Sequence, residues 1–231
     1  MSNGYLSVIM PVYNEKDTIR EIVDKVLALN VLKELIIVDD SSDDGTRDIL
    51  RSMGSRGNVT VLLHDKNMGK GAAICTGREK VTGEIVAIQD ADLEYDPKEL
   101  EELTRPIREG VADAVYGSRL WGGKPQRVHM FWHLMGNRFL TLVTDILFNA
   151  TLTDMETCYK VMRADVFRQM RLKSRDFCIE PEITAKILKK KLRVYEMPIS
   201  YYGRTYEEGK KITWRHGITA LWSLLRYRFT D

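Results

Sequence analysis

Residues 84–94 read EIVAIQDADLE, an apolar run that ends in two aspartates, Asp90 and Asp92. The run has the length and the β-branched content of a buried strand. Side chains two positions apart point to the same side of an extended chain, so both carboxylates would face one point beyond the strand. Two hard oxygen ligands at such a point suit Mg²⁺ or Mn²⁺ held together with the phosphates of a substrate. A D-x-D triplet taken alone is also typical of a solvated acidic turn.

Apolar runs alternate with helical patterns through the first half of the chain. The first run, YLSVIM, is expected to end at Pro11, and a helical pattern begins at Asp17. The fourth expected helix has a proline near its start, where proline is tolerated. Besides the run quoted above, we expect strands at residues 5–10, 34–38, 59–63 and 112–116, with helices at about 17–29, after 46, from 69 to about 80 and from 97 to about 108.

Strands that alternate with helices of 10–15 residues favour βαβ units and a mainly parallel sheet. In such sheets, ligands bind at the carboxyl ends of the strands. Three polar clusters fall at these ends, and together they indicate a binding site more strongly than any one of them does. The clusters are Pro11 with Tyr13, Asp39 with Asp40, and Asp90 with Asp92.

The pattern changes after Gly117. Residues 129–148 form a long, strongly apolar helical segment. Core packing is the default interpretation of this segment, and an apolar face against lipid or a partner is the alternative. The last helix, 214–229, mixes aromatic and aliphatic residues with arginines, and no linker or repeat interrupts the chain, so we expect a single domain. Between these helices we expect a short strand to Val161, helices near 164–171 and 181–190, and an extended segment at 193–202.

Composition limits the possible partners and the compartment. Residues 1–100 carry 12 Lys and Arg against 18 Asp and Glu, whereas residues 186–231 carry 11 against 4. A basic end is typical of proteins that bind nucleic acid, anionic lipid or a phosphorylated substrate, but no zinc-finger or RNP-like pattern favours nucleic acid. Three cysteines without a C-x-x-C pair favour a reducing cytosol. We expect neither a signal peptide nor a transmembrane helix.

Four short motifs follow one another along the chain: PVYNE (11–15), VDDSSDDGT (38–46), NMGKG (67–71) and DADLE (90–94). In this order they resemble the GT-A fold of family 2 glycosyltransferases. Two further features, GSR (117–119) and the loop from Arg204 to Lys210, resemble the branch that glycosylates polyprenyl phosphates, including dolichyl-phosphate mannosyltransferase. The resemblance covers essentially the whole chain.

The resemblance implies a Rossmann-like α/β domain over residues 1–231, with a mainly parallel sheet flanked by helices. Within this single domain we expect a nucleotide-sugar-binding half at 1–118 and an acceptor half at 119–213. A C-terminal amphipathic helix at 214–229 would complete the domain.

On the donor side, the resemblance implies a nucleotide-sugar site with a divalent cation. Asp90 and Asp92 would bind Mg²⁺ or Mn²⁺ on the diphosphate, with Glu94 as a further metal ligand. In dolichyl-phosphate mannosyltransferases a glutamine commonly stands where this chain has Glu94. Asp39 or Asp40 would accept a hydrogen bond from the base. The other residues implied for this site are Pro11, Tyr13 and Glu15 around the base and ribose, Lys70 and Ala91 beside the nucleotide, and Arg204 and Lys210 on the phosphates.

On the acceptor side, the resemblance implies that Arg119 binds the phosphate of the acceptor. An alcohol acceptor would need a general base, near Asp154 or Glu156. A phosphate acceptor has a second pKa of about 6 and is already largely ionised at neutral pH. Asp154, a further catalytic candidate, would then orient or repel groups instead of abstracting a proton. A divalent cation with Arg and Lys donors would neutralise charge on the leaving diphosphate.

The leading hypothesis is an inverting, metal-dependent enzyme that moves a hexose from GDP-mannose or UDP-glucose to a polyprenyl phosphate. It would act at the cytosolic membrane face, attached peripherally through 129–148 and 214–229, with a membrane-anchoring subunit as a possible partner. One alternative is a family 2 enzyme with a saccharide or protein acceptor, and another is a non-catalytic subunit that binds nucleotide sugars. A phosphohydrolase of the D-x-D-x-T type is disfavoured because position 94 is glutamate.

Overall fold

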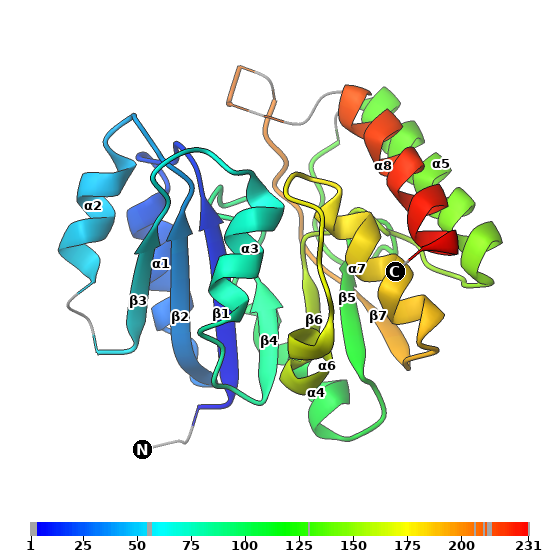
Figure 1. Cartoon of the computed structure of the whole chain (residues 1–231), viewed down its shortest axis with the longest axis horizontal. Helices are drawn as coiled ribbons and strands as arrows, with labels where there is room; N and C mark the ends of the chain where they lie inside the picture. The colour runs from blue at the N-terminus through cyan, green and yellow to red at the C-terminus, as the bar shows by residue number, and fades with distance from the viewer. Residues whose placement is uncertain are drawn as a thin grey trace.

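A seven-stranded sheet forms the centre of the computed structural model, which describes residues 4–54, 57–128, 130–205, 207–209, 211 and 214–230. The strand order is β3-β2-β1-β4-β6-β5-β7, and within this sheet only β6 runs antiparallel to its neighbours (Figure 1). The predicted α/β fold with a mainly parallel sheet is therefore confirmed. The strands are β1 (Leu6–Val12), β2 (Leu32–Asp39), β3 (Val59–Leu63), β4 (Ile85–Ile88), β5 (Ala114–Ser118), β6 (Lys160–Arg163) and β7 (Val194–Pro198).

Helices flank the sheet on both faces. In Figure 1, α3 lies in front of β1 and β2, and α1 lies behind them. Helices α5 and α8 pack side by side at the end of the molecule remote from the first three strands. The helices are α1 (Ile19–Leu27), α2 (Thr46–Met53), α3 (Lys70–Arg78), α4 (Glu99–Arg108), α5 (Phe131–Phe148), α6 (Ala164–Gln169), α7 (Ile179–Lys189) and α8 (Trp214–Phe229).

Strand β1 does not stop at Pro11, as the sequence predicted, but continues to Val12. Pro11 has no N–H to donate. A strand therefore tolerates proline only where the position of its N–H faces no hydrogen-bonded neighbouring strand. Pairing of β1 with β4 ends at Ile9, whereas pairing with β2 continues through Val12. The missing N–H of Pro11 therefore leaves no bond of the sheet unmade, and the strand carries Tyr13 to the carboxyl edge.

Strand β6 lies antiparallel between β4 and β5, an arrangement that the sequence did not indicate. Ala87 pairs with Val161 on one side, and Val115 pairs with the same residue on the other. The chain reaches β6 from the carboxyl edge of the sheet, after α5. Because it enters from that edge, the strand runs against its neighbours and places residues 154–159 beside the end of β4.

The long apolar segment lies outside the main core and packs only in part, against a small second cluster, so the default interpretation of core packing holds only for one side of it. Along α5 only Leu140, Thr141 and Thr144 are buried, whereas Trp132 is 82% exposed and Ile146 is 72% exposed. In the part of the chain that the structure describes, α5 makes most of its contacts with helices α8 and α7, which explains this exposure. Among the described residues, no helix is both long and apolar enough to cross a bilayer. This small second cluster joins α5 to α8 and consists of Leu140, Met155, Ala220 and Leu224.

Small residues let α3 lie close to the sheet. A Cβ atom built on Gly77 would lie 2.7 Å from Cγ2 of Ile9 and 3.4 Å from Cγ2 of Val38. Both contacts are with β-branched side chains of the core, which have little freedom to move away. Gly77 thus sets the distance between α3 and the sheet, and with it the position of Lys70 at the start of the helix.

We expect Gly77→Ala to destabilise the fold by about 1–3 kcal/mol, because the added methyl group overpacks the core. Urea unfolding followed by circular dichroism measures the change. Gly54→Ala is the matched control, since its nearest neighbour atom would lie 3.8 Å away and its φ is −64°. Equal losses of stability in the two variants would contradict the close-packing argument.

Candidate active site

A cavity of about 1150 Å³ opens at the carboxyl ends of β1, β2 and β4. Most of the residues selected from the sequence meet there, although they come from distant parts of the chain. Asp39 and Asp154 are fully buried outside its lining, and Lys210 lies outside the described residues. The predicted residues that line the cavity are Pro11, Tyr13, Glu15, Asp40, Lys70, Asp90, Ala91, Asp92, Glu94, Arg119 and Arg204.

Asp90 is paired with a lysine at the start of α3. Lys70 Nζ lies 2.8 Å from Asp90 Oδ1 and 3.1 Å from Glu180 Oε1. Burial alone would raise the pKa of Asp90, but the charge and hydrogen bond of Lys70, together with Cys158 and the charge of Lys160, lower that pKa below its usual value. Asp90 is therefore ionised at neutral pH, in the form that binds a cation.

Asp92 lies in a tight turn after β4. Leu93 has a φ of 62°, which non-glycine residues rarely adopt, and the N–H of Glu94 donates to Asp92 Oδ1 at 3.1 Å. Burial raises the pKa of Asp92 to about 7, and the neighbouring carboxylates of Asp90 and Glu94 add to this effect. Arg204, 3.3 Å away, lowers the pKa in part. The anionic form of Asp92 is thus destabilised in the folded protein. Additional positive charge beside the carboxylate would stabilise that form.

Glu94 supports the segment that follows β7. Its Oε1 accepts a hydrogen bond from the N–H of Arg204 at 2.7 Å, and its Oε2 accepts one from the hydroxyl of Tyr201 at 3.0 Å. Both oxygens are thus used within the chain, and a metal-binding role for Glu94 stays a prediction. Within the described ranges, no three Asp, Glu, His or Cys side chains are grouped as a metal site. A cation on Asp90 and Asp92 would therefore need further oxygen atoms from a ligand.

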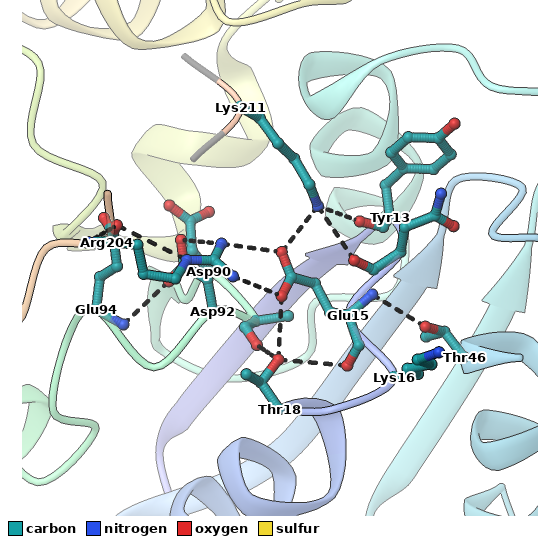
Figure 2. Close-up of polar contacts among 12 residues, drawn as sticks. Tyr13, Glu15, Lys16, Thr18, Thr46, Asp90, Asp92, Glu94, Arg204 and Lys211 are labelled. Atoms are coloured by element: carbon teal, nitrogen blue, oxygen red, sulfur yellow. Dashed lines mark hydrogen bonds and ion pairs between the residues drawn. The ribbon is translucent and has the colours of Figure 1, made fainter. Parts of the chain in front are cut away.

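Arg204, for which the sequence predicted a role as phosphate clamp, lies among the carboxylates of Glu15, Asp92 and Glu94, and that role stays a prediction. Its two terminal nitrogens donate to the two oxygens of Glu15, each at 3.1 Å. Figure 2 shows its guanidinium between Glu15 on one side and Asp92 and Glu94 on the other. The same cluster could bind this arginine or a cation, because both neutralise the same carboxylates.

Lys211 is a site residue that the sequence did not reveal. Its Nζ lies 2.8 Å from Glu15 Oε1 and also donates to the carbonyl of Tyr13 (Figure 2). The sequence-based prediction selected the adjacent Lys210. Two consecutive lysines in a loop carry no signal that distinguishes the one facing the site.

The aspartates at the end of β2 are tied into the loops around them. The carboxylate of Asp40 accepts hydrogen bonds from the N–H groups of residues 68–69 at 2.8 and 2.7 Å, and His64 Nδ1 lies 2.7 Å from it. Asp39 forms an ion pair with Arg47 at 2.8 Å. Of the two aspartates, Asp40 lines the cavity. They hold the loops at this end of the cavity in place, and their predicted contact with a base stays a prediction.

Asp154 holds Arg119 in one orientation. Asp154 is fully buried and accepts three hydrogen bonds from Arg119, from its backbone N–H at 3.0 Å and from Nε and Nη2 at 2.7 Å each. The guanidinium also lies 5.2 Å from the centre of the Tyr201 ring. Because both oxygens of Asp154 face Arg119, the geometry favours the orienting role for Asp154 over proton abstraction.

Beyond Arg119 the cavity continues between α5 and α8. Leu140 of α5, Ala220 of α8 and Phe177 line this part of it. Gly136 and Gly217 also line it, and a Cβ atom built on either would meet no atom within 4 Å. The far end of the cavity is thus lined largely by apolar residues, together with His133, Asn137 and His216, and it has room between the two helices.

Two glutamates in the cavity wall were not selected from the sequence as binding residues. Glu180 lines the cavity from the start of α7, and Glu156 lines it from the turn before β6. An acidic residue in the first turn of a helix is usually explained by its favourable interaction with the helix dipole. The sequence position of Glu180 therefore did not indicate a binding role. Glu156 was considered only as a general base.

A mainly parallel α/β sheet, an aspartate pair after β4 and basic side chains over the same cavity define a glycosyltransferase of the GT-A fold. The sequence model described as glycosyl transferase family 2 matches residues 7–171. The chain belongs to glycosyl transferase family 2.

Curated relatives and solved structures resemble almost the whole chain. It is 31% identical to the low-salt glycan biosynthesis hexosyltransferase Agl6 of Haloferax volcanii, over 91% of this chain but 52% of the relative, so it spans about half of that protein. It is 26% identical to the UDP-N-acetylglucosamine–dolichyl-phosphate N-acetylglucosaminyltransferase of Methanococcus voltae, over 97% of this chain and 96% of the relative. The crystal structure of glucosyl-3-phosphoglycerate synthase from Mycobacterium tuberculosis shares the fold, with a TM-score of 0.77 and 16% identity over 99% of this chain and 80% of that chain.

Replacing Asp92 by asparagine should stabilise the metal-free protein above neutral pH. The pKa of Asp92 is about 7 in the folded state against 3.8 for an ordinary aspartate, so the folded state binds this proton more tightly than the unfolded state. The contribution of Asp92 to the free energy of unfolding therefore falls as the pH rises from about 4 to about 7. In EDTA, Asp92→Asn should raise the melting temperature at about pH 8 and change it little at about pH 4.

The control for this experiment is Asp48→Asn, because the Asp48 side chain is 80% exposed on α2. It should leave the melting temperature unchanged at both pH values. A lower melting temperature for Asp92→Asn at the higher pH would show that the carboxylate stabilises the fold, against the expectation.

Proposed function

We propose that this chain transfers a hexose from a nucleoside diphosphate sugar to a polyprenyl phosphate, with inversion at the anomeric carbon and with Mg²⁺ or Mn²⁺. The observation that carries the proposal is the continuity of the cavity. It runs from the carboxylates at the strand ends, past Arg119, to the apolar space between α5 and α8. A phosphate on a long apolar chain fits the second half of this path, and a nucleotide sugar fits the first.

The residues at the end of β4 fit a divalent cation. Asp90 and Asp92 offer hard carboxylate oxygens that Mg²⁺ and Mn²⁺ prefer, and the diphosphate of the donor would supply the remaining ligands. When bound there, such a cation neutralises charge on the leaving diphosphate. Lys70, Arg204 and Lys211 add donors on the same side, and the last two would pass from Glu15 to phosphate oxygens.

Arg119 would bind the acceptor phosphate, held in position by Asp154. One oxygen of that phosphate would face the anomeric carbon from the side opposite the diphosphate. The bond from this oxygen to the carbon forms as the bond to the diphosphate oxygen breaks, which inverts the configuration. Because the phosphate is already ionised at neutral pH, no side chain has to remove a proton.

The exposed faces of α5 and α8 support attachment to a membrane. They are continuous with the apolar end of the cavity, and Arg226 and Arg228 near the end of α8 suit anionic headgroups. The acceptor would enter from this surface, at the cytosolic face, with or without an anchoring subunit. The exposed apolar residues are Phe131, Trp132, Phe139, Leu142 and Ile146 of α5, and Ile218, Trp222, Leu225 and Phe229 of α8.

GDP-mannose and UDP-glucose are the donors that we propose to test first. One curated relative is named for transfer to dolichyl phosphate, which supports a polyprenyl-phosphate acceptor here. The glucosyl-3-phosphoglycerate synthase with the same fold was crystallised in complex with Mn²⁺, UDP and phosphoglyceric acid, which supports a metal-assisted nucleotide site. Neither name identifies the sugar that this chain transfers.

Incubation of labelled donors with polyprenyl-phosphate membranes and Mn²⁺ tests the function. Label should enter the organic phase with one donor, and Asp92→Ala should abolish that transfer because it removes a metal ligand. Asp48→Ala, on the exposed surface of α2, is the control and should transfer normally. Label found in saccharide or protein instead would support the alternative acceptors. Donor binding without any transfer would support the non-catalytic subunit.

Removing the side chain of Arg119 should lower kcat/KM for the lipid acceptor by about a hundredfold, since a buried charge pair with phosphate is lost. Arg119→Lys keeps the charge without the bidentate geometry and should lose less. Transfer assays with varied acceptor concentration measure both. Full activity in Arg119→Ala would exclude Arg119 as the phosphate ligand.

The double variant Trp222→Ser and Leu225→Ser should weaken binding to vesicles with anionic lipid by about tenfold or more, because two apolar side chains leave the interface. Vesicle sedimentation measures this. Val111→Ser with Tyr195→Ser is the matched control, since these side chains are 42% and 48% exposed but lie outside α5 and α8. Vesicle binding that survives the first pair of substitutions would rule out α8 as the membrane contact.

A further inference from the structure

Unpartnered polar atoms are concentrated in the cavity. Among the described residues, four buried side-chain atoms have no hydrogen-bond partner: Glu156 Oε1, Glu180 Oε1, Arg204 Nε and Ser223 Oγ. The first three belong to residues that line the cavity. Leaving such an atom unpaired costs about 1–3 kcal/mol, so natural proteins usually have a reason for it. Three of them in one cavity point to a ligand that completes their hydrogen bonds.

Glu180 is held in place by two lysines, one of them fully buried and the other, Lys70, partly exposed. Its Oε2 accepts a hydrogen bond at 2.7 Å from Lys160, which is fully buried. Its Oε1 lies 3.1 Å from Lys70 Nζ, an ion-pair contact without the geometry of a hydrogen bond. Lys70 in turn lies 2.8 Å from Asp90. Glu180 Oε1 is therefore fixed at the cavity wall, one lysine away from the aspartate that would meet the diphosphate.

Glu156 lines the cavity from the turn before β6, and its Oε1 is one of the buried atoms without a hydrogen-bond partner. Burial raises its pKa to about 7; Lys160 and Arg119 lower that pKa in part, and Glu180 raises it. The carboxyl group therefore lies within electrostatic reach of both Arg119 and Glu180. Near neutral pH it exists partly as the acid, so it can donate as well as accept a hydrogen bond.

The group to be transferred has to lie between Asp90 and Arg119, because the leaving diphosphate lies at one and the acceptor phosphate at the other. Carboxyl oxygens in that space are suited to hydroxyl groups, each of which donates one hydrogen bond. An apolar group would leave these oxygens unpaired. An anionic group would be repelled by them.

We propose that Glu156 and Glu180 form a hexose-binding subsite, in which one oxygen of each carboxyl group accepts a hydrogen bond from a hydroxyl of the donor sugar. This inference rests on the proposed function and adds the chemical class of the transferred group, a neutral hexose with free hydroxyls. A hexuronic acid is disfavoured, because its carboxylate would approach two acidic side chains.

Calorimetric titration separates sugar binding from nucleotide binding. The probes are UDP, UDP-glucose, UDP-glucuronic acid, GDP and GDP-mannose, each with Mn²⁺ and the full chain. For each base, the Kd of the diphosphate divided by the Kd of its hexose derivative reports the contribution of the sugar. In Glu156→Ala and in Glu180→Gln, this ratio should fall about tenfold for whichever of UDP-glucose and GDP-mannose the wild type transfers from. The Kd of the corresponding diphosphate should stay unchanged.

Glu182→Gln is the matched control. Glu182 lies on the same helix as Glu180 and is buried, but its carboxylate binds the N–H groups of residues 173–174 and Lys186 Nζ and does not line the cavity. This variant should keep the ratio of the wild type. The wild type should bind UDP-glucuronic acid more weakly than UDP-glucose.

Several outcomes would overturn the inference. If the wild type transfers a hexose but both variants keep its ratio, the subsite is wrong and the proposed function stands. Equal affinity for UDP-glucose and UDP-glucuronic acid would remove the restriction to neutral hexoses. If no probe binds the wild type, the proposed function fails as well. Glu180→Gln alters the partner of buried Lys160, so thermal melting is used to check that this variant folds. If it does not fold, the ratio measured in Glu156→Ala alone tests the subsite.

Discussion

The site depends on carboxylates that are held close together where water is scarce. Like charges repel strongly in such surroundings, so the cluster requires positive charge nearby. Lys70 supplies it from α3, and Arg204 and Lys211 supply it from the segment after β7. The sheet fixes the acids, whereas two of the three cations come from a surface segment. The acids concerned are Glu15, Asp90, Asp92 and Glu94.

Much of the fold could be predicted from the sequence because its strands are short apolar runs bounded by polar clusters. The third strand was predicted at its observed bounds, residues 59–63. The end of β1 beyond Pro11 and the direction of β6 could not be predicted, because both depend on which strand lies alongside. The exposure of α5 was predicted only as the alternative interpretation, because apolar content does not distinguish a helix under a sheet from one that shares a small cluster with another helix.

The rule that ligands gather at strand ends brought most of the predicted residues into one cavity. What the sequence could not give is the partner of each side chain. Glu94 supports the backbone of Arg204, and Asp154 is occupied by Arg119, because segments more than thirty residues away along the chain arrive beside them. Glu180 was missed because its pairing with Lys160 and Lys70 exists only after α7 has packed on the sheet.

The antiparallel pairing of β5 with β6 has a consequence for the segment that connects these two strands. The N–H of Gly117 donates to the carbonyl of Tyr159 at 2.8 Å. The segment 119–158 between β5 and β6 therefore leaves the sheet and returns to it at adjacent positions. A segment whose two ends are joined in this way can change in length without changing the register of strands β1 to β4, which precede it in the chain. A change of length or sequence within 119–158 would therefore alter the walls of the cavity that this segment supplies, Arg119 and Glu156 among them, while the strands before it keep their pairing.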